Sequence, residues 1–387
     1  MKILLAGGGS GGHVTPLKAI YEALKQQEPV MPEVAVIVDR GFYTQTLSIF
    51  GSDSNIEIKK ISSGKYRRYK SKSLVWHIVH LPTLLKNLRD IFLLGIGVTQ
   101  SVFYFLLHKP DVVFCKGGFV CVPVGLAARL FKVPLIIHDS DTRPGLTNRI
   151  LARWAKKIGT GMPTSFYPYP KSAMVYTGIP VKSEFKKVSS GKKQAYKREL
   201  DLPVDRPIIL VTGGGNGSTP LNNCVQAAAQ QLLEDGWGIV HLAGKGKAAK
   251  LLEARDNLPK DLRSAWRIDE FADMVPRLLA ADVVISRTSA STIQECANAQ
   301  KTVIGIPSPH LDDQKLNAEF FDSKKAIIYL DEENLLTDRG SLSKVLKDLK
   351  ADPKRAEKLA LTLHEQFSKP LAAQQLARLI SDTALSS

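Results

Sequence analysis

The chain has 387 residues, of which 44% are hydrophobic and 23% are charged. These values are typical of a soluble globular enzyme, and the length favours two domains over a single core. The four cysteines form no C-x-x-C pair, which disfavours a disulfide framework or a zinc site. Fifty-three Lys and Arg against thirty-seven Asp and Glu give a net charge of +16, which indicates an anionic partner: nucleic acid, anionic lipid or a phosphorylated substrate.

Neither a signal peptide nor a membrane-spanning helix is predicted. The apolar run before the first glycines, residues 3–6, is too short for a signal sequence. The longest apolar stretch, residues 91–107, is interrupted by glycines and polar residues. We therefore expect no apolar segment of the roughly 20 residues that a bilayer requires.

Short β-branched apolar runs alternate with helical patterns along the chain. Strands are predicted at residues 2–6, 34–38, 56–61, 112–115, 135–138, 157–160 and 173–176, with helices such as 17–26 and 122–131 between them. After a break at Gly178-Ile-Pro180, further strands are predicted at residues 208–212, 238–242, 266–268, 283–286, 302–306 and 326–329, followed by helices. This alternation predicts two α/β domains with parallel, doubly wound sheets, at residues 1–177 and 178–367. We expect a C-terminal helix, 368–387, to pack back on the first domain.

The first predicted strand runs directly into the glycine-rich turn 7–12 and then His13. Glycine leaves room for backbone N–H groups to approach an anion. The pattern Gly7-x-Gly9-x-x-Gly12, with Asp39 ending the next strand, also fits a dinucleotide fingerprint, so a nicotinamide enzyme and a ligand-free tight turn stay open. At a helix start His13 is expected to have a lowered pKa, which suits either a general base or a helix-capping residue.

Polar segments follow three further strands. A second glycine loop, 213–218, follows the strand 208–212, and two such loops indicate two domains with a ligand held between them. His138–Asp141 follow another strand, where open α/β sheets bind ligands and where Asp and Ser also serve as N-caps. Residues 286–295 combine small hydroxyl side chains with Arg287, which suits a phosphate, although Thr292-x-x-Glu295 also fits a capping box.

A basic run between residues 59 and 72 leads into an apolar segment. Cations and aromatic residues beside apolar ones suit an anionic membrane surface, while nucleic acid or plain solvated surface would fit the same mixture. We assign membrane association to Lys65, Arg67, Arg68, Lys70, Lys72, Leu74, Trp76 and Leu81.

Several motifs occur in order along nearly the whole chain: Gly8-Gly-Ser-Gly-Gly-His13, Lys116-Gly-Gly-Phe119, His138-Asp-Ser-Asp141, Gly178-Ile-Pro-Val181, Thr212-Gly-Gly-Gly215, Ser286-Arg287 through Glu295, and Asp313-Gln314. Together they resemble the bacterial UDP-N-acetylglucosamine–N-acetylmuramyl-(pentapeptide) pyrophosphoryl-undecaprenol N-acetylglucosamine transferases. The resemblance implies a GT-B fold, with two Rossmann-like domains facing a central cleft. It further implies inverting transfer of N-acetylglucosamine that converts lipid I into lipid II, without a metal or other cofactor.

The resemblance also implies the partners and their sites. The UDP-N-acetylglucosamine donor is expected on the second domain, the undecaprenyl-linked acceptor on the first, and the enzyme at the cytoplasmic face of the cell membrane, peripherally and without nucleic acid. His13 and Asp139 are alternative candidates for the base, and Glu295 is expected to accept the ribose hydroxyls. The implied substrate contacts are Ser10, Gly11, Gly12, Asp141, Lys182, Gly215, Asn216, Phe271, Arg287, Ala290, Ser291, Thr292, Ile293, Gln294, Glu295 and Gln314. Lys182, Gly215 and Asp313 depart from a frequent arginine, serine and histidine of the family.

Overall fold

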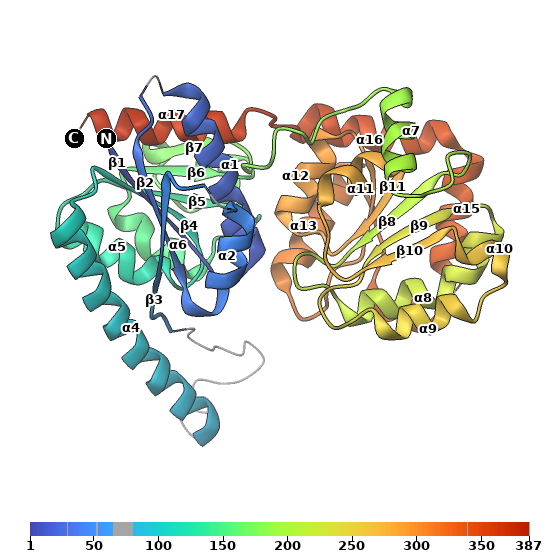
Figure 1. Cartoon of the computed structure of the whole chain (residues 1–387), viewed down its shortest axis with the longest axis horizontal. Coiled ribbons are helices and arrows are strands. Elements are labelled where there is room, and N and C mark those ends of the chain that lie inside the picture. Colours follow the sequence, from blue (N-terminus) through green and yellow to red (C-terminus); the bar gives the residue numbers. More distant parts are fainter. Residues whose placement is uncertain (29, 52, 65–79, 339, 387) are drawn as a thin grey trace. The chain divides into compact units, whose positions relative to one another are not determined.

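The computed structural model describes residues 1–28, 30–51, 53–64, 80–338 and 340–386. Its internal contacts divide the chain into two compact units (Figure 1). Unit 1 comprises Met1–Ser140, Pro144–Pro180 and Leu371–Ser387, and unit 2 comprises Asp141–Arg143 and Val181–Pro370. The chain thus enters unit 2 after Pro180 and returns to unit 1 at Leu371.

Unit 1 is built on a parallel seven-stranded sheet in the order β3-β2-β1-β4-β5-β6-β7. Its strands are β1 (Lys2–Gly7), β2 (Glu33–Asp39), β3 (Ile56–Ile61), β4 (Val112–Gly117), β5 (Leu135–Asp139), β6 (Lys157–Thr160) and β7 (Met174–Tyr176). Its helices include α1 (Gly11–Gln27), α2 (Tyr43–Phe50), α4 (Leu81–His108), α5 (Cys121–Leu130), α6 (Leu146–Leu151) and α17 (Ala372–Leu385). The strand order reverses between β1 and β4, which is where such sheets bind ligands.

The core of unit 1 lies between sheet and helices. Ile3 and Leu5 of β1 pack with Leu17 and Ile20 of α1 and with buried residues of α17. Helix α17 packs along α1, so the last helix of the chain completes the core of the first unit. The predicted helix 17–26 begins earlier than expected, at Gly11, because the glycines after Ser10 already form its first turn.

Unit 2 repeats this architecture with a parallel six-stranded sheet in the order β10-β9-β8-β11-β12-β13. The strands are β8 (Ile208–Thr212), β9 (Gly238–Leu242), β10 (Trp266–Asp269), β11 (Val283–Ser286), β12 (Thr302–Gly305) and β13 (Ile328–Tyr329). The helices are α7 (Ser190–Glu199), α8 (Thr219–Glu234), α9 (Ala249–Asp256), α10 (Lys260–Arg263), α11 (Met274–Ala280), α12 (Ala290–Asn298), α13 (Asp312–Ser323), α14 (Glu332–Thr337), α15 (Ser341–Ala351) and α16 (Pro353–Phe367).

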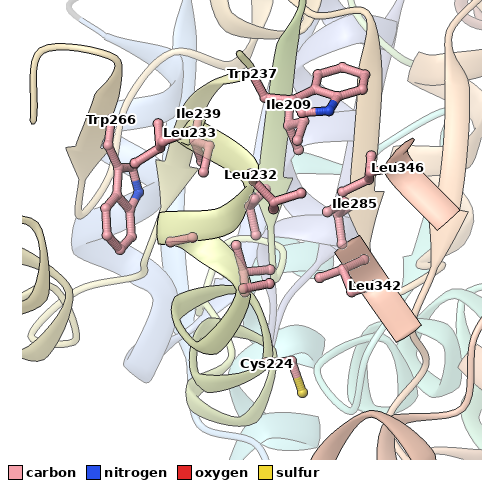
Figure 2. Packing of buried hydrophobic residues seen from close by; sticks show 14 of the residues in the cluster. Ile209, Cys224, Leu232, Leu233, Trp237, Ile239, Trp266, Ile285, Leu342 and Leu346 are labelled. Atoms are coloured by element: carbon pink, nitrogen blue, oxygen red, sulfur yellow. The ribbon is translucent and has the colours of Figure 1, made fainter. Parts of the chain in front are cut away.

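Apolar residues of α8, α15 and the sheet interlock in the core of unit 2. Figure 2 shows Leu232 of α8 among Ile209, Ile285 and Leu346, all of them buried. The expected fold class is confirmed: each unit is a doubly wound, Rossmann-like domain whose strand order reverses at one switch point, between β8 and β11 in unit 2.

In helix α4 the usual distribution of side chains is reversed, with polar residues buried and large apolar residues exposed. The buried face of the helix carries mainly polar or small residues, Thr83, Asn87, Asp90, Gly97 and Ser101, together with Phe105. Gly97 allows the close approach, because a Cβ there would lie 2.0 Å from the Ser62 carbonyl oxygen. The exposed face carries the large apolar side chains, namely Leu81, Leu85, Leu88, Ile91, Phe92, Phe103, Leu106 and Leu107.

The expectation that no segment is long and apolar enough to cross a membrane is wrong. Helix α4, with 28 residues, is long and apolar enough to cross a membrane, judged by length and composition alone. The expected interruption of residues 91–107 does not occur, because the helix continues through Gly95 and Gly97, and Pro82 stands in its first turn. Figure 1 shows α4 on the outside of unit 1, beside α5, with its first turns projecting beyond the sheet.

Candidate functional site

At the switch point of the unit 1 sheet, the glycine loop after β1 contacts a second glycine-containing loop, Gly117-Gly118, at the end of β4. The loop after β1 contacts the loop after β4, where the Gly8 N–H donates to the Gly117 carbonyl at 3.3 Å. Gly118 has φ +85°, and a Cβ there would lie 2.2 Å from the Gly8 carbonyl oxygen. Only glycine fits such a contact, so the two loops pack closely against each other, with Gly8 and Gly117 buried and Gly9 exposed.

Asp39, at the end of β2, binds the backbone of the glycine loop that follows β1. Its Oδ1 accepts a hydrogen bond from the Gly9 N–H at 2.6 Å, and the residue is buried. The carboxylate therefore holds the glycine loop. This arrangement disfavours the dinucleotide interpretation, in which Asp39 would have to bind a ribose.

His13 lies in the first turn of α1 with one ring nitrogen committed. Its Nδ1 is 2.7 Å from the Gly8 carbonyl, which can only accept, so Nδ1 carries the proton and Nε2 keeps its lone pair. The Ser10 hydroxyl is 3.2 Å from the same Nδ1. Burial and the Lys116 cation lower the pKa of His13 to about 4, opposed by the bond to Gly8. The direction agrees with the prediction, but the causes are burial and Lys116 rather than the helix terminus.

Asp139, the second candidate base, is held by three donors. Its Oδ1 accepts from the Asn148 Nδ2 at 2.8 Å and the Gly145 N–H at 3.2 Å, and its Oδ2 accepts from the Tyr169 hydroxyl at 2.6 Å. Burial raises the pKa of Asp139, and these hydrogen bonds oppose the rise. The carboxylate thus orders the loop between β5 and α6, and its oxygens already have partners.

In unit 2 the loop after β8 is fixed at its last residue. Ser218 is the N-cap of α8, and its hydroxyl contacts Nε and Nη2 of Arg287 at 2.9 and 2.5 Å. Arg287 itself is buried, donates to the Ile306 carbonyl and forms an ion pair with Glu332. The guanidinium therefore joins β11, α14 and the glycine loop, and its donors have internal partners.

The start of helix α12 excludes one of the two interpretations of Glu295. The helix begins at Ala290 with Ser289 as N-cap, so Thr292 and Glu295 lie inside it and the capping-box alternative is wrong. Burial raises the pKa of Glu295 to about 8, opposed by the Lys182 cation. A carboxyl group with this pKa is largely protonated at pH 7 before any ligand arrives.

The other implied donor contacts differ in accessibility. Ile293 is in the core, and the Gln294 amide donates to the Phe367 carbonyl at 2.9 Å, so both side chains are used internally. Phe271 is 74% exposed just after β10. A Cβ on Gly215 would meet no atom within 4 Å, so the glycine is not sterically required there.

Three further implied contacts, Lys182, Gln314 and Asp141, have polar partners in the structure. Lys182 pairs with Asp273 at 3.0 Å, and Gln314 accepts from the Ser308 N–H at 3.0 Å. Asp141 accepts from the Asn317 amide at 3.0 Å. The remaining members are near helix starts or in loops: Gly11 and Gly12 begin α1, Asn216 is exposed, and Ala290, Ser291 and Thr292 form the first turn of α12.

The predicted membrane-associating residues are only partly described. Lys65, Arg67, Arg68, Lys70, Lys72, Leu74 and Trp76 lie outside the described residues. Leu81 is described and is exposed in the first turn of α4.

Comparison with known proteins identifies the family. The Glycosyltransferase family 28 N-terminal domain matches residues 3–160 and the Glycosyltransferase family 28 C-terminal domain matches residues 208–376. A UDP-N-acetylglucosamine–N-acetylmuramyl-(pentapeptide) pyrophosphoryl-undecaprenol N-acetylglucosamine transferase from Lachnospira eligens is 36% identical over 91% of both chains. The chain belongs to this transferase family. A second transferase of that name, numbered 2, from Bacillus cereus is 34% identical over 86% of this chain and 88% of its own.

Solved structures agree with the fold of the transferase family. The crystal structure of Acinetobacter baumannii MurG has a TM-score of 0.69 at 23% identity and covers 98% of this chain and 99% of its own. Staphylococcus aureus MnaA, solved with UDP, has a TM-score of 0.65 at 17% identity over 98% and 96% of the two chains. At these identities the likeness shows the fold alone, and the expected GT-B fold is confirmed.

Sequence reasoning overlooked several residues of this transferase that hold the site together. Lys116 appeared only as part of a motif, although it is buried beside His13. Asn148, Tyr169 and Glu332 received no role, because their partners Asp139 and Arg287 are distant in sequence.

Proposed function

We propose that this chain transfers N-acetylglucosamine from UDP-N-acetylglucosamine to the 4-hydroxyl of the muramyl sugar of undecaprenyl-pyrophosphoryl-MurNAc-pentapeptide, with inversion, converting lipid I into lipid II. Membership of the transferase family supports the reaction. The observation that carries the mechanism is His13, a neutral imidazole whose Nδ1 is bonded to Gly8 and whose Nε2 keeps its lone pair.

His13 is the base of this proposal. Its Nε2 accepts the proton of the acceptor hydroxyl while the oxygen forms a bond to C1 of the donor sugar, and the C1–O bond to UDP breaks on the opposite face. The bond from Nδ1 to Gly8 fixes the tautomer and the ring orientation throughout. Asp139 is a positioning residue, because its oxygens already accept from Gly145, Asn148 and Tyr169.

The departing UDP gains negative charge, and unit 2 offers stabilisation at its switch point. The N-termini of α8 and α12 follow β8 and β11, which are adjacent strands, so their free N–H groups lie at the same sheet edge. Arg287 contributes by holding Ser218 and the glycine loop in place. Glu295 faces the ribose hydroxyls in this proposal, with Phe271 beside the uracil.

A transfer assay with labelled UDP-N-acetylglucosamine and lipid I in detergent tests the reaction. We expect His13→Ala to lower kcat by about a hundredfold or more, the usual contribution of a general base. The control His364→Gln, on α16 of unit 2, should leave the rate unchanged. Near wild-type turnover by His13→Ala would refute the base, and transfer only to a different lipid acceptor would refute the proposed substrate.

Membrane association through α4 is the second part of the proposal. A helix whose exposed face is apolar and whose buried face is largely polar presents a surface suited to contact with an apolar phase. At 28 residues α4 is about 42 Å long, and Lys86 and Arg89 lie among its exposed leucines. The packed Thr83, Asp90 and Ser101 disfavour lipid on all sides. We therefore place α4 in the membrane interface rather than across it, at the cytoplasmic face where the acceptor is anchored.

A further inference from the structure

Thr288 has an unusual backbone conformation in the turn between β11 and α12. Its φ is +55°, in the left-handed region that β-branched residues rarely adopt, because the branched side chain crowds the backbone there. The residue is fully buried, and its methyl group lies against Gly305 of β12, where a Cβ would come within 2.4 Å of it. A strained conformation persists only where the surrounding contacts hold it, and such positions concentrate at functional sites.

Hydrogen bonds from its backbone and its hydroxyl hold Thr288 in this conformation. Its N–H donates to the Ser286 hydroxyl at 3.2 Å, and its carbonyl accepts from the Asn317 amide at 3.1 Å. Its Oγ1 lies 2.7 Å from the carbonyl oxygens of both Arg287 and Gln314, and its single proton is shared between them. Gln314 and Asn317 both belong to α13, so the turn before α12 is joined to the start of α13 through backbone and side chain alike.

The first turn of α13 presents Gln314 with only one end of its amide occupied. The N-cap residue of this helix, Leu311, has no side-chain group that could cap it, so the bonds to Thr288 help to fix the helix start. The Gln314 Oε1 accepts from the Ser308 N–H at 3.0 Å, and because a backbone N–H only donates, the atom facing it is the amide oxygen. Nε2 then has no hydrogen-bond partner among the residues that the structure describes, and its two N–H groups are available to a ligand oxygen.

We propose that Thr288 is a positioning residue for recognition of the donor sugar: it ties Gln314 to the turn before α12, so that the unused N–H groups of Gln314 meet an oxygen of the sugar. This inference rests on the proposed function, in which the N-terminus of α12 faces the UDP of the donor. Thr288 thereby sets the distance between the groups that bind the phosphates and the group that binds the sugar. It acts through position alone, since its own side chain is fully buried.

Matched threonine variants of the full chain separate this role from general stability. Thr288→Val keeps the branched shape and removes the hydroxyl, whereas Thr288→Ser keeps the hydroxyl and removes the methyl group. The control Thr302→Val makes the same change on β12, where a buried hydroxyl donates to the Ala356 carbonyl at 2.8 Å. Thr288→Val and Thr302→Val each lose one hydroxyl-to-carbonyl bond of unit 2, so a merely structural role predicts the same result for both.

The binding of UDP and of UDP-N-acetylglucosamine is measured by calorimetry, together with kcat and the donor KM. In Thr288→Val we expect UDP-N-acetylglucosamine to bind about tenfold more weakly, with a matching rise in KM, the effect of one well-placed hydrogen bond. The binding of UDP should change much less, because Gln314 contacts the sugar. Thr288→Ser and Thr302→Val should bind both ligands as the wild type does. Equal weakening of both ligands in Thr288→Val, or the same loss in Thr302→Val, would overturn the proposal.

Hydrogen–deuterium exchange without a ligand tests the tie itself. The backbone amides at the start of α13 should exchange faster in Thr288→Val than in the wild type, and at the wild-type rate in Thr302→Val. Unchanged exchange in Thr288→Val would overturn the tie. A wild-type chain that does not bind UDP-N-acetylglucosamine would refute the proposed function, whereas wild-type binding with unchanged affinity in Thr288→Val would refute only the role of Thr288.

Discussion

Replacing Leu88 and Phe92 on α4 by serine removes two apolar side chains from the face that we place in the membrane. These residues are 53% and 69% exposed, so more than half of each side chain has no contact with unit 1. Fully burying a Leu or Phe side chain is worth about 1.5 to 3 kcal/mol, so the exposed shares are worth about 1 to 2 kcal/mol each. The double variant should lose about 3 kcal/mol of membrane binding, which is a partition coefficient roughly 100-fold lower.

The measurement is partitioning between buffer and vesicles of defined composition, together with unfolding by denaturant. Because neither side chain contributes much to the core, the free energy of unfolding should fall by no more than about 1 kcal/mol, mainly from helix propensity. The matched control is Leu336→Ser with Leu361→Ser, two exposed leucines on helices of unit 2, which should leave partitioning unchanged. Binding to neutral vesicles should resist salt, whereas the extra binding to anionic vesicles should weaken with it. Partitioning equal to the wild type, or a loss matched by an equal loss of stability, would refute the interfacial role of α4.

Three further outcomes are expected. Burial raises the pKa of Glu295 to about 8 in the folded protein, so the folded state keeps a proton there that the unfolded chain loses above pH 4.5. The free energy of unfolding should therefore fall between pH 5 and 8, by at most about 1.4 kcal/mol per pH unit. Urea titrations of Glu295→Gln should show that this slope is gone. Arg287→Met leaves Glu332 as an unpaired buried charge and should cost about 3 to 5 kcal/mol, most of which a second change, Glu332→Leu, should restore; full destabilisation of the double variant would contradict this. Gly118→Ala combines a strained φ of +85° with a Cβ 2.2 Å from the facing loop and should lower transfer by about tenfold or more while UDP binding persists, whereas Gly95→Ala, with open space around its Cβ, should be neutral.

The apolar runs in the sequence were enough to predict the strands of both sheets. Each predicted strand is present. The central strands, such as β4 and β8, are buried along their whole length, and a buried parallel strand requires the continuous apolar run that the sequence shows there. The same patterns did not predict helix α4 as a continuous apolar helix. Its apolar residues face outward and its packed face is largely polar, so the usual link between apolar periodicity and burial is reversed there.

Periodicity and motifs are enough to predict two Rossmann-like halves, a glycine loop at the end of the first strand of each, and His13 beside the first loop. The contacts of the side chains around those loops depend on the folded arrangement. Asp139 and Arg287, predicted as a candidate base and a phosphate ligand, have internal partners that are distant in sequence, Tyr169 and Glu332. Gly117 and His13 are more than a hundred residues apart, and the imidazole lies against the Gly117 backbone because β1 and β4 are neighbours at the switch point. Protonation states depend on burial and on charges brought together by folding, and neither can be read from a motif.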